Sequence, residues 1–251
     1  MPQVLFEKHG PVAIVTLNRP ERLNAISETL LDGMHAALLK AQIDETVKAI
    51  VLAGAGRAFC AGADLKEFAG QPATAEYTSN YVEKIQQVTR GIMFSGKPVV
   101  GAIQGFAVGG GFEWMLNCDM VVAADDLVCF FPEMSWGQFV TGGVTHLLPQ
   151  AVGHQRAMEL WLLGEKQSAD TLHRLGLVNR VVPKEKVLDT AIELAEKISE
   201  RSTFTVSRLK KMVNTQLSGQ LATALQLEAE AAASAMGHED TRKRVAGFSG
   251  Q

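Results

Sequence analysis

The chain has 251 residues, 47% of them hydrophobic, and a formal net charge of −3 at pH 7. This length and apolar fraction suit one large domain with a sizeable core, with room for a short appendage. The charge gives no electrostatic case for nucleic acid or an anionic membrane surface as a partner, and no apolar run approaches the roughly 18 residues of a membrane-spanning helix.

The first residues and the cysteines bear on the compartment. Residues 1–7 lack the basic segment and the long apolar core of a signal peptide. Cys60, Cys118 and Cys129 are odd in number and show no ligand-like spacing. We therefore expect a cytoplasmic protein with three reduced thiols and no metal site.

Up to about residue 183, strand and helix patterns alternate. Residues 4–8 and 12–17 predict two strands joined by a hairpin turn at residues 9–11. Ser27 is a predicted N-cap for a helix that runs to about Gln42. Further strands are predicted over residues 49–53, 99–104, 120–124 and 128–131, and further helices over residues 75–94, 112–118 and 145–152. The alternation indicates an α/β fold of parallel strands with crossover helices.

Beyond residue 183 no clear strand signal remains. Residues 184–214 and 220–235 predict two helices, the second strongly alanine-rich. We therefore expect a core over residues 1–190 and a helical C-terminal region over residues 191–251. Such a region is often used to pack against neighbouring subunits.

The most informative stretch is residues 105–114, Gly-Phe-Ala-Val-Gly-Gly-Gly-Phe-Glu-Trp, an apolar strand end that runs into three glycines. Glycines allow a tight turn and leave the backbone open to a ligand. The helix expected over residues 112–118 would direct its unpaired N–H groups and its positive dipole end at that ligand. The sequence thus predicts a site for negative charge with Glu113 beside it.

Residues 57–67 form a second small-residue turn after a predicted strand, in which Ala61, Gly62 and Ala63 expose backbone N–H groups. Two such turns can direct two N–H donors at one oxygen, which is the arrangement of an oxyanion hole. The alternative is that both turns are ordinary connections between strands and helices.

Glu133 follows a predicted buried strand, directly after Pro132, which fixes the backbone. A single glutamate at such a place is usually a solvated loop charge. Paired with Glu113 beside an oxyanion hole, it can instead share general acid and base catalysis, because close like charges push the two pKa values apart.

In their order and spacing, these motifs resemble the crotonase superfamily, the enoyl-CoA hydratase/isomerase fold. The resemblance covers nearly the whole chain and implies a crotonase-like spiral of ββα units with a C-terminal helical appendage. The segments that carry it are residues 17–25, 58–65, 109–113 with 118–119, 132–133 with 142–143, and 175–178 with 181–183.

The resemblance implies an acyl-CoA thioester substrate, whose thioester oxygen would lie between the N–H groups of Ala63 and Gly110. Family members that hydrate 2-enoyl-CoA use two glutamates, and Glu113 and Glu133 fill both positions. In that mechanism the pair holds a water, one carboxylate takes its proton as oxygen adds at Cβ, and a proton is delivered to Cα. The two glutamates therefore favour an enoyl-CoA hydratase.

The resemblance also indicates where the coenzyme lies and how the chain assembles. Arg22 and Lys66 are candidate phosphate partners, although each is also explained as a solvated surface charge. Other residues expected at the substrate are Ala25, Ala61, Asp64, Leu65 and Thr141. No cofactor is expected, because coenzyme A is part of the substrate. The family commonly forms homotrimers or hexamers built from two trimers, and its C-terminal helices, here residues 191–251, usually cover the site or that of a neighbouring subunit.

Two features bear on the acyl group. Thr141 stands where hydratases of this family usually carry glycine, so its hydroxyl orients the water, narrows the pocket or is tolerated without a role. Aromatic residues flank the motifs at Phe112, Trp114, Phe131, Trp136 and Phe139. At least half of them are expected in the core, and the rest predict a pocket for a short or a flat, ring-bearing acyl group.

Rival functions remain open at this point. An enoyl-CoA isomerase would use Glu133 alone, and a thioester hydrolase or a carbon–carbon bond-cleaving enzyme would use the same oxyanion hole. A dinucleotide site is disfavoured because residues 109–111 are Gly-Gly-Gly rather than part of G-x-G-x-x-G. A non-catalytic scaffold or RNA-binding protein is disfavoured by the charge balance and by the intact glutamate pair.

Overall fold

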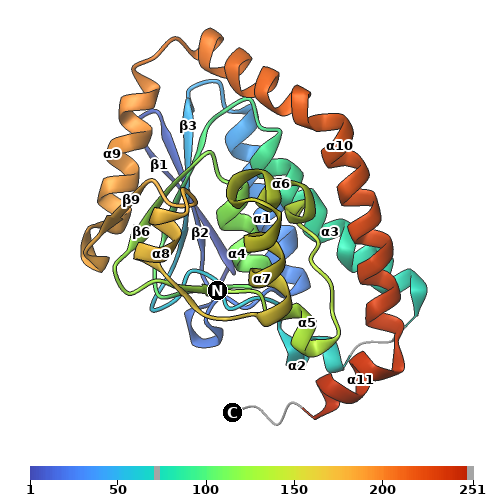
Figure 1. Ribbon diagram of the computed structural model, residues 1–251. Coiled ribbons are helices and arrows are strands. Elements are labelled where there is room, and N and C mark those ends of the chain that lie inside the picture. The colour runs from blue at the N-terminus through green and yellow to red at the C-terminus, as the bar shows by residue number, and fades with distance from the viewer. Residues whose placement is uncertain (71–73, 248–251) are drawn as a thin grey trace.

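The computed structural model describes residues 1–70 and 74–247, which form a larger and a smaller sheet with surrounding helices (Figure 1). The larger sheet has the strand order β1-β2-β3-β4-β6-β9. Its strands are β1 (Val4–His9), β2 (Val12–Leu17), β3 (Ala49–Gly54), β4 (Val99–Ile103), β6 (Met120–Ala124) and β9 (Arg180–Val182). β1 pairs with β2 antiparallel, and the other neighbouring strands of this sheet are parallel. The predicted hairpin and parallel strands are therefore confirmed.

The smaller sheet has the order β5-β7-β8, with strands β5 (Phe106–Val108), β7 (Val128–Phe130) and β8 (Gln167–Ser168). β5 and β7 are parallel, and β7 and β8 are antiparallel. β5 and β7 lead directly into the two glutamate segments predicted to be functional.

Helices cover both faces of the larger sheet. Successive side chains of a strand point to opposite faces, and the apolar side chains on each face are buried against helices. Ala13 and Val15 of β2 join the core beneath α1 (Glu28–Ile43) and α3 (Ala75–Met93), whereas Val12 and Ile14 face α9 (Val187–Ser199). Within residues 1–70 and 74–247, no helix has the length and apolarity needed to cross a membrane.

The predicted start of the first helix is confirmed, whereas two later helices begin at other residues than predicted. Ser27 caps α1 as predicted, since its Oγ accepts a hydrogen bond from the Leu30 N–H at 3.2 Å. The helix expected from residue 112 begins earlier, as α4 (Gly110–Asn117), and the one expected from residue 145 is α6 (Val144–Val152). β5 confirms the strand end expected before the three glycines. The sequence analysis missed β8, β9, α2 (Leu65–Ala69), α5 (Glu133–Trp136), α7 (His154–Leu163) and α8 (Ala169–Arg174).

The C-terminal helices differ from the prediction in their boundaries. The break lies at residues 200–202, between α9 and α10 (Thr203–Gly237), rather than at residues 215–219. A glycine inside a helix costs about 1 kcal/mol, and packing of α10 along α3 outweighs that cost at Gly219 (Figure 1). α10 leads into α11 (Glu239–Ala246). Because α9 packs on the sheet, the boundary expected at residue 190 falls inside a helix of the core.

Asn24 ties the loop after β2 to the loop after β3. It is fully buried, with a φ of 55°. Its Oδ1 accepts a hydrogen bond from the Arg19 N–H at 2.7 Å, and its Nδ2 donates to the carbonyls of Ala55 at 3.0 Å and Ala58 at 2.9 Å. The second loop continues into residues 61–63, so this one amide sets the spacing between two predicted parts of the site.

We expect Asn24→Ala to lower the free energy of unfolding by about 3 kcal/mol, because it removes buried hydrogen bonds and leaves a side chain at positive φ. Asn24→Gly loses the same bonds but tolerates the φ, so it should cost about 1 kcal/mol less. Urea unfolding followed by circular dichroism measures both. Variants as stable as the wild type would contradict the role assigned to this amide.

Candidate active site

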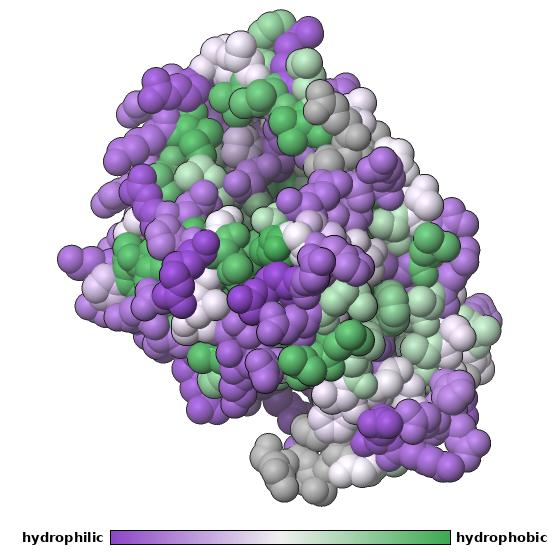
Figure 2. Space-filling view, viewed as in Figure 1, coloured by the Kyte–Doolittle hydropathy of each residue, from purple (hydrophilic) through white to green (hydrophobic). Residues whose placement is uncertain are grey.

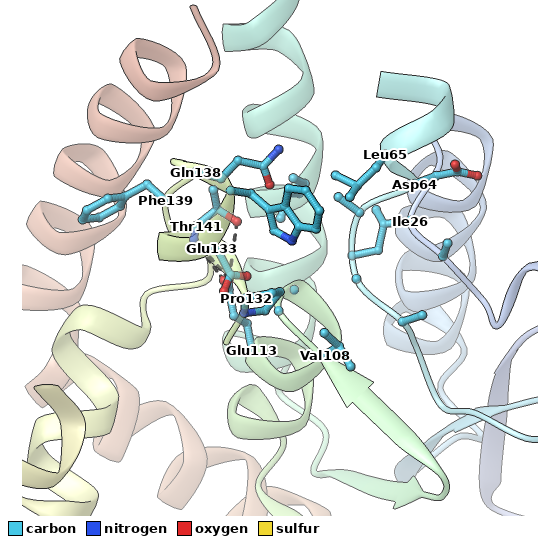
Figure 3. A pocket seen from close by; sticks show the side chains of 18 of the residues that line it. Ile26, Asp64, Leu65, Val108, Glu113, Pro132, Glu133, Gln138, Phe139 and Thr141 are labelled. Atoms are coloured by element: carbon cyan, nitrogen blue, oxygen red, sulfur yellow. Dashed lines mark hydrogen bonds between the residues drawn. The ribbon is translucent and has the colours of Figure 1, made fainter. Parts of the chain in front are cut away.

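The residues predicted for the site line a single cavity of about 390 Å³ at the carboxyl ends of the parallel strands (Figure 3). The structure brings together all of those predicted: Arg22, Ala25, Ala61, Ala63, Asp64, Leu65, Lys66, Gly110, Glu113, Glu133 and Thr141. Open α/β sheets commonly bind ligands at this edge. The positions agree with the sequence analysis, and the roles of the residues stay predictions.

Ala63 and Gly110 line the cavity from different loops. Ile26 donates to the Gly62 carbonyl at 2.8 Å and accepts from the Asp64 N–H at 3.0 Å, so the Ala63 N–H, between them, is directed away from Ile26. Gly110 is the first residue of α4, where an N–H has no partner within the helix. In the described chain neither of these two N–H groups donates a hydrogen bond to another loop or side chain.

Close packing where the two loops meet requires glycine at residue 62 and favours it at residue 110. A Cβ on Gly62 would lie 2.9 Å from the Val108 carbonyl oxygen, and one on Gly110 would lie 2.8 Å from Ile26 Cδ1. Gly62 also has a φ of 83°, a conformation that side chains disfavour. The small residues read from the sequence therefore serve close packing between the loops as well as access to the backbone.

Glu113 lies on α4 and is 1% exposed. Its Oε2 accepts hydrogen bonds from the Thr141 N–H at 3.1 Å and the Thr141 hydroxyl at 3.3 Å, drawn as dashed lines in Figure 3. The Gly142 N–H also donates to this carboxylate. A Cβ on Gly142 would lie 2.5 Å from Oε2, so the approach depends on glycine there.

Glu133 begins α5 directly after Pro132 and is 7% exposed. Its Oε1 lies against Gly109, where a Cβ would clash with it. Its Oε2 is buried and, among the residues the structure describes, has no hydrogen-bond partner. A buried oxygen of this kind is a place where water or a substrate group can bind.

Burial dominates the electrostatics of this pair. It raises the pKa of Glu133 to about 7. It raises the pKa of Glu113 well above its usual range, and the charges of Glu133 and Glu228 raise it further, while the Thr141 and Gly142 N–H groups oppose the rise. No ion pair in the described ranges involves either carboxylate. The two groups titrate as a unit that retains a proton near neutral pH.

The aromatic residues separate into two groups. Phe112, Trp114 and Phe131 are buried in the core, as expected for at least half of them. Trp136 and Phe139 line the cavity, and Phe139 points toward α10 in Figure 3. The sequence analysis missed further lining residues because they come from distant helices or carry no motif: Tyr81 and Ile85 of α3, Met236 of α10, and Gln138.

The predicted coenzyme-binding residues differ in the exposure and in the contacts of their side chains. Arg22 and Lys66 are exposed at the mouth of the cavity. The Asp64 side chain instead accepts hydrogen bonds from two N–H groups at the start of α2 and forms an ion pair with Arg19 at 2.9 Å. Figure 3 shows its carboxylate directed away from the two glutamates. Asp64 therefore shapes the loop, and Arg19 is a structural partner that sequence reasoning missed.

Comparisons with known proteins place this geometry in context. A family model described as enoyl-CoA hydratase/isomerase matches residues 7–250. A "probable enoyl-CoA hydratase" of Rhizobium meliloti is 36% identical over 98% of this chain and 94% of its own length. A "1,2-epoxyphenylacetyl-CoA isomerase" of Escherichia coli is 34% identical over the same shares. The solved structure of an enoyl-CoA hydratase/isomerase from Mycobacterium paratuberculosis superposes with a TM-score of 0.92 at 28% identity, over 98% of each chain. These findings confirm the predicted crotonase-like α/β fold.

The raised pKa of Glu133 predicts a pH-dependent effect on stability. Between its usual value of 4.5 and about 7, the unfolded chain loses this proton while the folded chain keeps it, so rising pH lowers the stability of the wild type. Glu133→Gln removes that effect. We expect its stability relative to wild type to improve from pH 4.5 to pH 8 by up to about 3 kcal/mol.

Thermal or urea unfolding at several pH values measures this difference. Glu193→Gln is the matched control, because the same substitution is made there at an exposed glutamate on α9. A Glu133→Gln difference that is the same at pH 4.5 and pH 8 would show that Glu133 titrates normally.

Proposed function

Because the chain belongs to the enoyl-CoA hydratase/isomerase family, we propose that it adds water across the 2,3 double bond of a 2-enoyl-CoA thioester. One observation carries the proposal. Two glutamates with raised pKa values, Glu113 and Glu133, line the cavity that the Ala63 and Gly110 backbone also lines. Hydration requires a base for water, an acid for Cα and donors for the thioester oxygen, and this set contains all three.

The N–H groups of Ala63 and Gly110 form the oxyanion hole in this proposal. As hydroxide adds at Cβ, electrons move toward the thioester oxygen and produce an enolate. Donors directed at that oxygen stabilise the enolate more than the ground state, and each is worth about 3 kcal/mol of barrier. The position of Gly110 at the start of α4 supports this role, since the helix dipole is positive there.

The carboxylate pair moves the protons. A water bound between Glu113 and Glu133 gives one proton to the ionised member while its oxygen bonds to Cβ. The protonated member gives its proton to Cα, so the pair holds one proton before and after the reaction. The raised pKa values support this assignment, because carboxyl groups at usual values would both be ionised near pH 7.

The coenzyme portion of the substrate lies at the mouth of the cavity, along Ala25, Ala61 and Leu65. The exposed positions of Arg22 and Lys66 support a role for both cations in binding phosphates. The reaction needs no separate cofactor, because the thioester itself stabilises the enolate.

The acyl group extends toward α3 and α10. Trp136 and Phe139, with Tyr81 and Met236, supply flat, apolar walls. These walls support a short or ring-bearing acyl group rather than a long flexible chain, since aromatic faces pack best against planar groups.

One observation favours a second candidate, an enoyl-CoA isomerase. Thr141 stands where the hydratases usually carry glycine, and both its N–H and its hydroxyl hold Glu113 Oε2. If these bonds keep Glu113 out of the reaction, Glu133 alone would carry a proton from one carbon to another.

Assembly as a homotrimer or a hexamer belongs to the same proposal. Phe204, Leu209 and Met212 of α10 are about two-thirds exposed, at 65%, 65% and 64%. Figure 2 shows apolar surface around a hollow where α10 begins, at the top of the view. Apolar surface of this kind supports contact with another subunit. A cytoplasmic location stays a prediction.

We expect the purified protein to hydrate crotonyl-CoA, measured as the loss of absorbance of the conjugated thioester. A 2-enoyl-CoA with a phenyl ring at Cβ should also react, whereas a sixteen-carbon 2-enoyl-CoA should show a kcat/KM at least roughly tenfold lower because the pocket suits compact groups. No turnover with any of the three would reject the hydratase.

Removing either carboxylate should stop the chemistry without stopping binding. We expect Glu113→Gln and Glu133→Gln each to lower kcat by roughly 10²- to 10⁴-fold, with the Kd for butanoyl-CoA changed only about threefold. Glu193→Gln serves as the control at an exposed site. Full hydration by Glu113→Gln would reject the acid/base role of Glu113, whereas a wild type that shifts the double bond of a 3-enoyl-CoA and does not hydrate crotonyl-CoA would replace the hydratase with the isomerase.

A further inference from the structure

A third carboxylate, Glu228, binds the same short segment that binds Glu113, and it has no part in the mechanism above. It belongs to α10 and is 1% exposed. It comes from a part of the chain more than 90 residues beyond Glu133 in sequence, and no motif marks it. In the described ranges it forms no ion pair. A buried carboxylate without a cation is costly, so its contacts require an explanation.

Glu228 is held by donors of one short segment. The Gly143 N–H donates to its Oε2 at 2.6 Å, and the N–H and hydroxyl of Thr145 donate to its Oε1 at 2.8 and 2.5 Å. Three donors satisfy both oxygens and replace the water lost on burial. The carboxylate therefore fixes the chain from residue 143 to residue 145 at the start of α6.

The same segment holds Glu113 from its other end. The N–H groups of Thr141 and Gly142 donate to Glu113, and the Gly142 carbonyl accepts a hydrogen bond from Asn117 Nδ2 of α4 at 2.9 Å. Residues 141–145 thus lie between two buried carboxylates, Glu113 on one side and Glu228 on the other. A shift of residue 143 moves the neighbouring donors that orient Glu113.

Packing fixes Glu228 in turn. Gln86 Nε2 of α3 donates to the Leu225 carbonyl of α10 at 2.6 Å, which sets the position of α10 one turn before Glu228. A Cβ on Gly143 would lie 2.6 Å from Leu221 Cδ1, so α10 is in direct contact with the segment. α10 therefore contacts residues 143–145 both through the Glu228 carboxylate and through Leu221.

We propose that Glu228 is a positioning residue, which holds residues 141–145 in the arrangement that orients Glu113 for proton transfer. The inference rests on the proposed hydration for its effect on rate, but its effect on the segment stands apart from any activity. It links the C-terminal helix, which sequence analysis assigned to packing and cover, to the geometry of the reaction. The Coulombic effect of Glu228 on Glu113 agrees with their proximity.

Glu228→Gln tests the inference, because an amide has the same shape but can accept on one side only. We expect kcat for crotonyl-CoA to fall roughly 10- to 100-fold with KM changed less than about threefold, since small displacements of a catalytic group act on the transition state. Amide hydrogen exchange at residues 141 and 142 should become at least roughly tenfold faster. Glu230→Gln, an exposed glutamate two residues along α10, should match the wild type in both measurements.

A milder pair of variants covers the case in which Glu228→Gln does not fold. Thr145→Val removes one hydroxyl donor and should lower kcat roughly three- to tenfold, whereas Thr145→Ser keeps the donor and should restore it. All rates are compared at a temperature where circular dichroism shows each variant fully folded.

Unchanged kcat and unchanged exchange in Glu228→Gln would overturn the inference, as would equal losses in Thr145→Val and Thr145→Ser. A wild type without hydration would reject the proposed function only. The exchange comparison would then still decide whether Glu228 holds the segment, because it requires no substrate.

Discussion

The site depends on the burial of two carboxylates at one cavity without a cation to neutralise them in the described chain. Burial raises both pKa values, to about 7 for Glu133, and their mutual repulsion raises that of Glu113 further. Each must therefore be held in place by its surroundings rather than by attraction to a partner charge. Glu113 lies on α4, and Glu133 lies directly after Pro132 at the start of α5. The backbone therefore holds the two carboxylates at one cavity against their mutual repulsion. Burial of the two carboxyl groups therefore lowers the stability of the fold. The same burial keeps a proton on the pair near neutral pH.

The rest of the fold brings backbone donors to the same place. Parallel strands end at one edge, and Asn24 and the glycines at 62, 109 and 110 allow the loops that follow them to approach closely. The C-terminal helix then closes the arrangement from outside, since α10 contacts the segment that holds Glu113. The geometry of the cavity consequently depends on strand ends, close loop packing and a helix distant in sequence.

The sequence was sufficient for the fold class and for those lining residues that belong to the small-residue turns and the glutamate segments. Alternating strand and helix patterns, the Ser27 cap and small-residue turns are local signals, and the structure confirms those elements. The sequence was insufficient for features that depend on contacts between residues distant in the chain. The helix break at residues 200–202, the inclusion of α9 in the core, and the contribution of Tyr81 and Met236 all depend on packing between distant segments. The ion pair between Asp64 and Arg19 was not predicted either, because no sequence motif marks it.

The most direct test of the account is a crystal structure of the wild-type protein with butanoyl-CoA, a saturated thioester that cannot be hydrated. We expect the thioester oxygen about 3 Å from the N–H nitrogens of both Ala63 and Gly110. Cα and Cβ should face the carboxylates of Glu113 and Glu133. A thioester oxygen bound to neither N–H group, or an acyl chain directed away from the two glutamates, would contradict it.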